Sequence, residues 1–126
     1  MKNLLLVKIV HFPVFLVIVV FGAGCAERQK NEFESYAELE DSELIGKGWV
    51  PKFIPKSAYG IKESHRVDQP YINVEFSFQQ GDLTGIEENC SKENENTYEC
   101  ENTGYPVKVE IIGGNYAKVY SLPSST

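Results

Sequence analysis

The chain has few of the residues from which metal centres and many active sites are built. Its 126 residues include two histidines, three cysteines, one methionine and one tryptophan. No CxxC pair is present, and Cys90, Cys100 and His65 are too few ligands for a tetrahedral zinc site. A phosphate-binding glycine loop and a nucleophile elbow are also missing. We therefore predict no metal, no cofactor and no catalytic residue, and we expect a protein that is not an enzyme.

Positive charge is scarce as well. Twelve Lys and Arg stand against 18 Asp and Glu, which gives a formal net charge of −6, and loss of Lys2 and Lys8 with the first 24 residues would lower it to −8. Nucleic acids and anionic lipids both need a cationic surface. The charge therefore disfavours them as partners. It would steer a cationic protein toward the chain, but solubility alone also explains it and is the favoured interpretation.

One long apolar segment is present, and it lies at the N-terminus. The chain is almost wholly apolar up to residue 24 and ends this run in the small residues of FGAGC, as an export signal does. This sequence resembles a bacterial lipobox, with Gly22 where Leu or Val is usual. The resemblance implies that residues 1–24 are a lipoprotein signal peptide and that Cys25 carries the lipid. The alternative is a transmembrane anchor over residues 4–24, which is long enough to span a bilayer.

Lipidation would make the membrane a partner and hold the domain outside the cytoplasm. By resemblance to enteric lipoproteins, Ala26 after Cys25 implies an outer-membrane lipoprotein that faces the periplasm; the alternative is an inner-membrane N-terminal anchor. Residues 25–31 are expected to be a short polar tether. In this oxidising compartment the two remaining cysteines, Cys90 and Cys100, are expected to form a disulfide.

The hydrophobic pattern predicts a single α+β domain over residues 32–122. An N-terminal helix is expected to pack on a small antiparallel sheet of four or five strands, with one disulfide. The helix is predicted over residues 31–45, because Asn31 is a good N-cap and Glu34 would complete a capping box. Residues 123–126 are expected to be a frayed tail.

Alternating apolar and polar residues predict the strands. They are expected at residues 61–65, 71–78, 107–112 and 116–122, with another short strand beginning at Leu83. For the last hairpin, a three-residue loop at 113–115 pairs Glu110 with Lys118 and leaves apolar pairs on the other face. We therefore predict this register, with Asn115, or a glycine shifted by one position, in the left-handed position that such a loop needs.

The segment from residue 48 to residue 68 joins the predicted helix to the predicted sheet. Two prolines exclude a regular helix from its first part, so we expect a structural motif that plugs the core, formed by Gly48, Trp49, Pro51 and Pro55. The polar second part is the candidate binding surface, formed by Ser57, Glu63, His65 and Asp68. His65, Asp68 and a nearby serine are the residue types of a catalytic triad, but nearness in sequence is not triad geometry. A structural role for them is favoured.

The same segment carries a family resemblance. The sequence GWVP at residues 48–51 is followed by a second proline, by Ser57-Ala58 and by the pair His65 and Asp68, and then by an alternating strand. This order resembles the YbbD head-domain family, a group of uncharacterised bacterial envelope proteins. The resemblance is expected to extend from Asn31 to about Leu122. It implies no known activity and therefore no catalytic residue.

A second stretch is similar to another group of proteins. Tyr98, Cys100 and Gly104 resemble the Tyr-x-Cys-x-x-Gly segment of membrane-bound lysozyme inhibitors, with the glycine one residue late. Three functions are therefore considered: a non-enzymatic envelope binding or interaction module, an inhibitor of a cationic cell-wall hydrolase such as lysozyme, and a small periplasmic enzyme. The first is the leading hypothesis.

Overall fold

The computed structural model describes residues 28–122. The predicted signal peptide at 1–24, the lipidated Cys25, the first part of the predicted tether and the predicted frayed tail at 123–126 lie outside the described residues. Strand β1 begins at Arg28, so residues 28–31, which were assigned to the tether, are part of the sheet.

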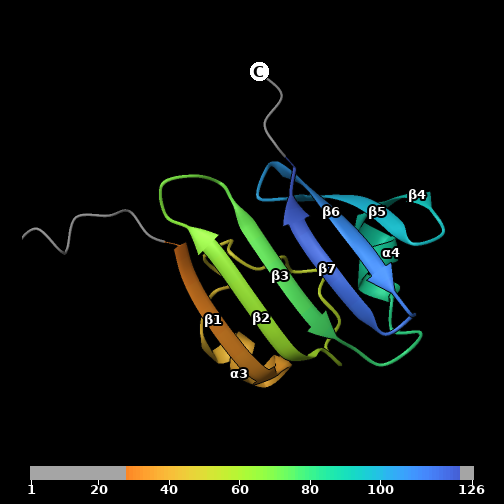
Figure 1. The fold of residues 1–126 in the computed structure, drawn as a ribbon, viewed down its shortest axis with the longest axis horizontal. Helices are drawn as coiled ribbons and strands as arrows, with labels where there is room; N and C mark the ends of the chain where they lie inside the picture. Colours follow the sequence, from red (N-terminus) through yellow and green to blue (C-terminus); the bar gives the residue numbers. More distant parts are fainter. Residues whose placement is uncertain (1–27, 123–126) are drawn as a thin grey trace, which may run out of the picture.

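The described chain forms a seven-stranded antiparallel sheet with two short helices (Figure 1). The strands are Arg28–Ser35 (β1), Tyr59–Arg66 (β2), Ile72–Ser77 (β3), Ser91–Asn94 (β4), Thr97–Asn102 (β5), Tyr105–Ile112 (β6) and Tyr116–Ser121 (β7). The helices are Tyr36–Asp41 (α3) and Thr84–Asn89 (α4). The strand order is β1-β2-β3-β7-β6-β5-β4. Strands β1 to β3 and strands β4 to β7 are thus two meanders of consecutive strands, and they are joined where β3 pairs with β7.

The predicted fold, an N-terminal helix on a sheet of four or five strands, is wrong. The first element is β1, which runs antiparallel to β2 and pairs Phe33 with Ile61. Its charged side chains at positions 28, 30, 32 and 34 alternate with Gln29, Asn31 and Phe33. This period of two is the strand signal, but two of the three residues on the inward face are polar, so an apolar pattern does not reveal it.

The helix that does form is short and begins later than predicted. Ser35 is the N-cap of α3, and its hydroxyl accepts a hydrogen bond from the Glu38 backbone N–H at 3.3 Å. The Glu38 carboxylate in turn accepts from the Glu34 backbone N–H at 2.9 Å. The sequence Ser-x-x-Glu at 35–38 is therefore the capping box, and Asn31 lies inside a strand.

Of two further predictions for the second half of the chain, one is wrong and one is confirmed. The short strand expected from Leu83 is wrong, because residues 84–89 form α4. The disulfide between Cys90 and Cys100 is confirmed. It links the end of α4 to β5, within a segment that the sequence presents as an acidic loop and that the structure folds into the β4–β5 hairpin.

The predicted register of the last hairpin is confirmed. Glu110 pairs with Lys118, and Ile111 pairs with Ala117. The left-handed backbone positions are taken by Gly113 (φ 66°) and Gly114 (φ 82°), as the alternative of a shifted glycine predicted, and not by Asn115. Glycine adopts positive φ without the steric cost that a β-carbon brings, which explains this choice.

One face of the sheet is covered and the other is open (Figure 1). Helices α3 and α4 and the connecting segment 42–58 lie behind the sheet in this view. Val50, Phe53 and Ile54 of that segment join the strand residues in one buried core. Helix α4 packs tightly on the segment, since a β-carbon on Gly85 would lie 2.8 Å from the Phe53 carbonyl oxygen. We call these two sides the covered face and the open face.

Candidate functional site

The covered face contains a group of polar side chains around the only tryptophan. The Trp49 ring stacks on the His65 ring with a centroid distance of 4.0 Å and an angle of 16° between the planes. The backbone before it is fixed by Gly48, which has a φ of 85° and whose carbonyl accepts a hydrogen bond from Asn102 Nδ2 at 2.9 Å. Pro51 follows and is fully buried. The GWVP segment therefore holds the indole in place over the sheet.

Glu63 and His65 are the two buried polar residues of the core. They lie two positions apart on β2, so both point to the covered face. His65 Nδ1 donates to Glu63 Oε1 at 2.5 Å, and Asn31 Nδ2 of β1 donates to Glu63 Oε2 at 2.9 Å. The Glu63 side chain is 0% exposed. We call Asn31, Trp49, Glu63 and His65 the Glu63 cluster.

The hydrogen bonds of the Glu63 cluster explain how a carboxylate is tolerated in the core. A buried carboxylate without partners is costly, and both Glu63 oxygens have a donor. No buried side-chain nitrogen or oxygen within residues 28–122 lacks a hydrogen-bond partner. The cluster thus joins β1 to β2 through hydrogen bonds, and the connecting segment to β2 through the stacking of Trp49 on His65.

The other predicted site residues lie elsewhere. Ser57 Oγ donates to Asp82 Oδ2 at 2.7 Å and accepts from the Gln79 backbone N–H at 3.0 Å, which ties the connecting segment to the loop after β3. Asp68 lies in the β2–β3 loop. It accepts two hydrogen bonds from the Arg66 guanidinium, at 3.2 and 3.0 Å, and these bonds lower the pKa of its carboxyl group.

The structure therefore brings Glu63 and His65 together and separates them from Ser57 and Asp68. Ser64, the other serine near His65, is the adjacent residue on β2 and points to the open face. A Ser-His-Asp arrangement needs the three side chains in mutual contact. None of the contacts described above joins His65 to a serine or to Asp68.

The open face carries a ladder of alternating charges that sequence reasoning did not identify. Strand pairing places five charged residues side by side in one row across five strands, in the order Glu32, Lys62, Glu75, Lys118 and Glu110. The Lys118 ammonium lies 3.7 Å from Glu75 Oε1. Opposite charges directly across a sheet stabilise the pairing. Only the register shows this row, because its members come from strands far apart in sequence.

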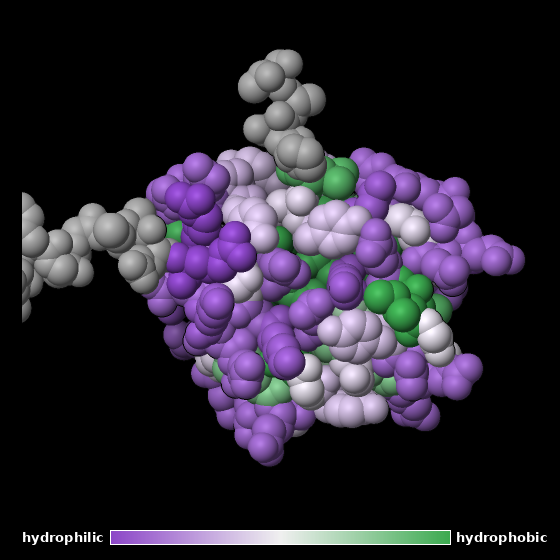
Figure 2. Space-filling model, viewed as in Figure 1, coloured by the Kyte–Doolittle hydropathy of each residue, from purple (hydrophilic) through white to green (hydrophobic). Residues whose placement is uncertain are grey.

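A second row on the open face is aromatic and apolar. Register pairs place Ser77, Tyr116 and Ile112 side by side at the end of the sheet near the β6–β7 hairpin, and Tyr59, which lies beyond a register shift in β2, pairs with Ser77. Tyr59 is 51% exposed and Ile112 is 47% exposed. Figure 2, which views this face, shows pale and green surface among the hydrophilic residues. We call these four residues the tyrosine row.

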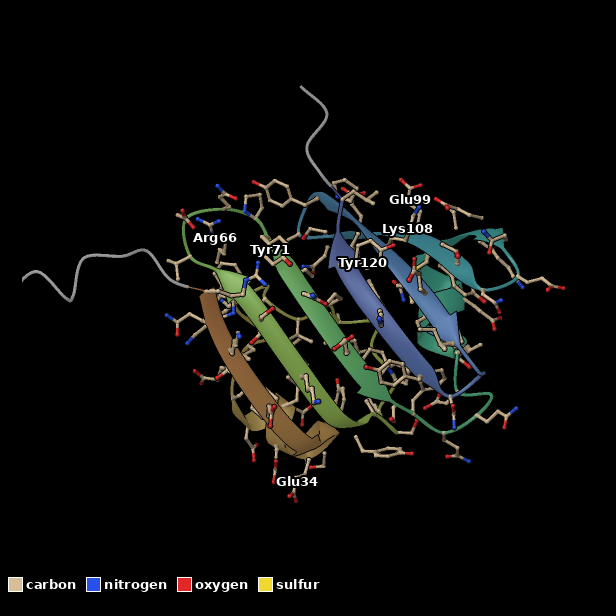
Figure 3. The ribbon with its side chains drawn as sticks, viewed as in Figure 1. Glu34, Arg66, Tyr71, Glu99, Lys108 and Tyr120 are labelled. Atoms are coloured by element: carbon tan, nitrogen blue, oxygen red, sulfur yellow. A yellow bond between two sulfur atoms is a disulfide. The ribbon has the colours of Figure 1, made fainter. Side chains whose placement is uncertain are left out.

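Acidic side chains gather on the same face over β4, β5 and β6. Glu93 Oε2 lies 3.4 Å from Lys108 Nζ. A hydrogen bond with Glu99 lowers the pKa of Glu93, and the same contact raises the pKa of Glu99. Glu110 accepts a hydrogen bond from the Tyr120 hydroxyl at 2.7 Å, which raises the pKa of Tyr120 to about 12. Figure 3 shows Glu99, Lys108 and Tyr120 on this side. We call Glu93, Glu99 and Glu110 the acidic corner.

No group of three or more His, Cys, Asp or Glu side chains that could hold a metal ion occurs between residues 28 and 122. Neither helix within the same range is long and apolar enough to cross a bilayer. The described residues thus form a hydrogen-bonded polar cluster on the covered face and a mixed aromatic and acidic surface on the open face.

Comparison with known families bears on the first half of this structure. Residues 27–77 match the YbbD head domain. The resemblance to the YbbD head-domain family is thus confirmed over β1, α3, the connecting segment, β2 and β3, which include the whole Glu63 cluster. The matched region ends at Ser77, well before Leu122, where the resemblance was expected to end. The match supports an envelope-associated protein and assigns no activity. No curated protein and no solved structure matches the chain.

Proposed function

We propose that the protein is a lipoprotein of the bacterial envelope, anchored by Cys25 in the outer membrane, and that it acts as a non-enzymatic binding module in the periplasm. Its binding surface is the open face of the sheet, and its partner is a cationic protein. The FGAGC sequence and the YbbD head-domain match support the placement in the envelope.

The tyrosine row is the observation that carries this proposal. Tyr116 and Ile112 lie on the open face, Tyr59 is exposed at the end of the same row, and both helices of residues 28–122 lie on the other face. Tyrosine is enriched at protein interfaces because its ring supplies apolar area while its hydroxyl remains hydrogen-bonded. A row of such side chains on a flat sheet suits a protein surface better than a small ligand.

The acidic corner favours a partner that carries positive charge. Glu110 lies two positions from Ile112 on β6, so both side chains are on the open face. A hydrogen bond with Glu93 raises the pKa of Glu99, and repulsion between the two carboxylates raises it further. A Lys or Arg of a partner placed between them would relieve that repulsion.

The geometry around His65 supports the non-enzymatic part of the proposal. His65 is buried under the Trp49 ring and bonded to Glu63, and Ser57 and Asp68 are engaged elsewhere. A general base must reach the proton that it removes. The candidate catalytic side chains support a small periplasmic enzyme less well than a binding module.

Photo-crosslinking in intact cells tests the binding surface. A photo-reactive residue in place of Ile112 should give a discrete crosslinked product containing a basic protein, and adding Tyr116→Asp should abolish it. The same residue in place of Lys30, which lies on the open face outside the tyrosine row, serves as the control. Identical products from both positions, or none from either, would contradict the proposal.

A second candidate function, inhibition of a cationic hydrolase such as lysozyme, is favoured by the acidic corner. The purified full-length protein should then reduce lysozyme activity, and Glu93→Gln with Glu99→Gln should restore it. The double variant Glu87→Gln and Glu88→Gln on α4 controls for net charge, because both residues are exposed and lie outside the acidic corner. Full lysozyme activity at micromolar protein would rule this function out.

The anchor is tested separately. Mass spectrometry of the mature N-terminal peptide should show acyl groups on Cys25, and Cys25→Ser should remove them and release the protein from the membrane fraction. An unmodified wild-type peptide would refute the lipoprotein assignment.

A further inference from the structure

One end of the sheet combines exposed apolar side chains with the start of the described chain. Strand β1 begins there at Arg28, beside the β2–β3 loop and at the same end of the sheet as the β5–β6 turn (Figure 1). Val67 in the loop is 71% exposed and Tyr105 at the turn is 51% exposed. We call this the anchor end, defined by Arg28, Arg66, Val67, Pro70 and Tyr105.

The anchor end is hollowed on both sides of Pro70 and Tyr105. A groove of about 320 Å³ lies between the loop and the turn, and Trp49 and Val67 are among its lining residues. A second hollow of about 610 Å³ is lined by Pro70, Tyr105 and Leu122. Apolar side chains that are exposed around a hollow commonly mark an interaction surface.

The charges at this end are arranged differently from those of the rest of the protein. Arg28 and Arg66 lie directly opposite each other on β1 and β2, where like charges destabilise the pairing. The Arg28 guanidinium lies 4.7 Å from the centre of the Tyr71 ring, and Arg66 binds Asp68. Figure 3 shows Arg66 and Tyr71 at this end. Guanidinium groups bind phosphate in a bidentate way, and both arginines lie at the end of the sheet where β1 begins.

The length of chain before β1 limits what this end can face. Two residues, Ala26 and Glu27, separate Cys25 from Arg28. At up to about 3.6 Å per residue, the step from Cys25 to Arg28 spans at most about 11 Å. If Cys25 is lipidated, the anchor end is therefore held beside the head groups of the membrane.

We propose that the anchor end docks on the phospholipid surface, with Val67 and Tyr105 in the interfacial layer and Arg28 and Arg66 at lipid phosphates. The inference rests on the proposed lipidation of Cys25. Tyrosine and arginine are favoured in the interfacial layer of a membrane, because each has an apolar part and a polar end. The net negative charge of the chain disfavours anionic lipid as a whole, whereas Arg28 and Arg66 place two positive charges at this end of β1 and β2.

Trp49 is a built-in reporter for this contact, because it is the only tryptophan and lines the groove with Val67. The full-length protein, produced with its own N-terminal segment, is reconstituted in phosphatidylethanolamine and phosphatidylglycerol vesicles that carry a quencher on the head group. Trp49 fluorescence should be quenched. Val67→Asp with Tyr105→Asp should remove most of the quenching while the protein stays with the vesicles and keeps its acyl groups.

The double variant Tyr59→Asp and Ile112→Asp is the matched control, since these residues have similar exposure at the opposite end of the sheet. It should leave the quenching unchanged. Unquenched Trp49 in a lipidated, vesicle-bound protein would overturn the inference, and so would equal quenching in both double variants. Failure to associate with vesicles together with an unmodified Cys25 would instead refute the anchor. Shielding of Trp49 from an aqueous quencher without vesicles would show that the chain itself covers the groove, which also overturns the inference.

Discussion

At the scale of single residues, Glu63 does more for the fold than its charge suggests. It connects β1 to β2 through Asn31 and positions the His65 ring on which Trp49 stacks. A buried polar group that is fully bonded constrains the geometry of its neighbours, because any shift leaves a group unpaired. The Glu63 cluster thus fixes the position of the GWVP segment relative to the sheet.

Replacement of Glu63 should therefore be costly. We expect Glu63→Ala to lower the free energy of unfolding by about 2–4 kcal/mol, because His65 and Asn31 lose their buried partner. Glu63→Gln keeps an acceptor and should cost less. Urea denaturation of both variants measures this, with Glu32→Ala as the exposed control on β1. A Glu63→Ala loss no greater than that of the control would contradict the role of the cluster.

The Tyr120 hydroxyl gives a prediction at alkaline pH. Its pKa is raised to about 12 in the folded protein from its ordinary value of 10.0, chiefly by the hydrogen bond to Glu110. A raised folded pKa means that the bond contributes stability below about pH 10, which is lost as the pH rises through about 12. Tyrosinate absorbance should show a late-ionising component that Tyr120→Phe removes and Glu110→Gln shifts to lower pH. A titration that both variants leave unchanged would show that Tyr120 is not held in this way.

At the scale of secondary-structure elements, the disulfide should matter most for the β4–β5 hairpin. All four residues of β4 are exposed, so little apolar burial holds this edge strand. Closing a loop of about ten residues contributes about 2–3 kcal/mol by restricting the unfolded chain. Cys90→Ser with Cys100→Ser should lower unfolding stability by that amount and speed hydrogen exchange in β5. Unchanged exchange in β5 would mean that pairing with β6 alone holds the hairpin.

The elements differ in how far the sequence could predict them. The register of β6 and β7 was predictable from the sequence. The pairing of Glu110 with Lys118 puts these charged residues on one face of the hairpin and the apolar residues on the other. Strand β1 was not, because Gln29 and Asn31 occupy its inward positions and its partner β2 lies beyond a long connection. The capping box at Ser35 was present in the sequence, but an apparent helix start at Asn31 competed with it. Strand β4 has no buried side chain and hence no apolar pattern.

The candidate site was predictable in part for the same reason. Glu63 and His65 alternate on a strand, so their common face follows from the sequence. Asn31 and Trp49 reach them from segments that only the fold brings close. Ser57 and Asp68 are near His65 in sequence and bind other groups. The tyrosine row depends on the register of four strands, and no local pattern could reveal it.

At the scale of the whole molecule, the sheet has one continuous core. Val74 of β3 pairs with Val119 of β7, and both are completely buried. We therefore expect a single cooperative unfolding transition, as is usual for small domains. Trp49 fluorescence reports unfolding of the half that matches the YbbD head domain, and far-ultraviolet circular dichroism reports unfolding of all strands. If there is one transition, the unfolding midpoints from the two measurements should coincide. Separate midpoints would show that the two meanders unfold independently.

The pairing of β3 with β7 is also expected to form later in folding than the other strand pairs. Every other strand pair joins consecutive strands, whereas Ser77 and Tyr116 meet only after the intervening residues 78–115 have closed a long loop. Closing such a loop is entropically slow relative to forming a hairpin. We expect each meander to form early and their docking to limit the rate, which stopped-flow refolding of Val119→Ala would detect as slower folding. Because the YbbD head-domain match ends at Ser77, the last residue of β3, the rate-limiting step would be the assembly of the matched half with the rest of the sheet.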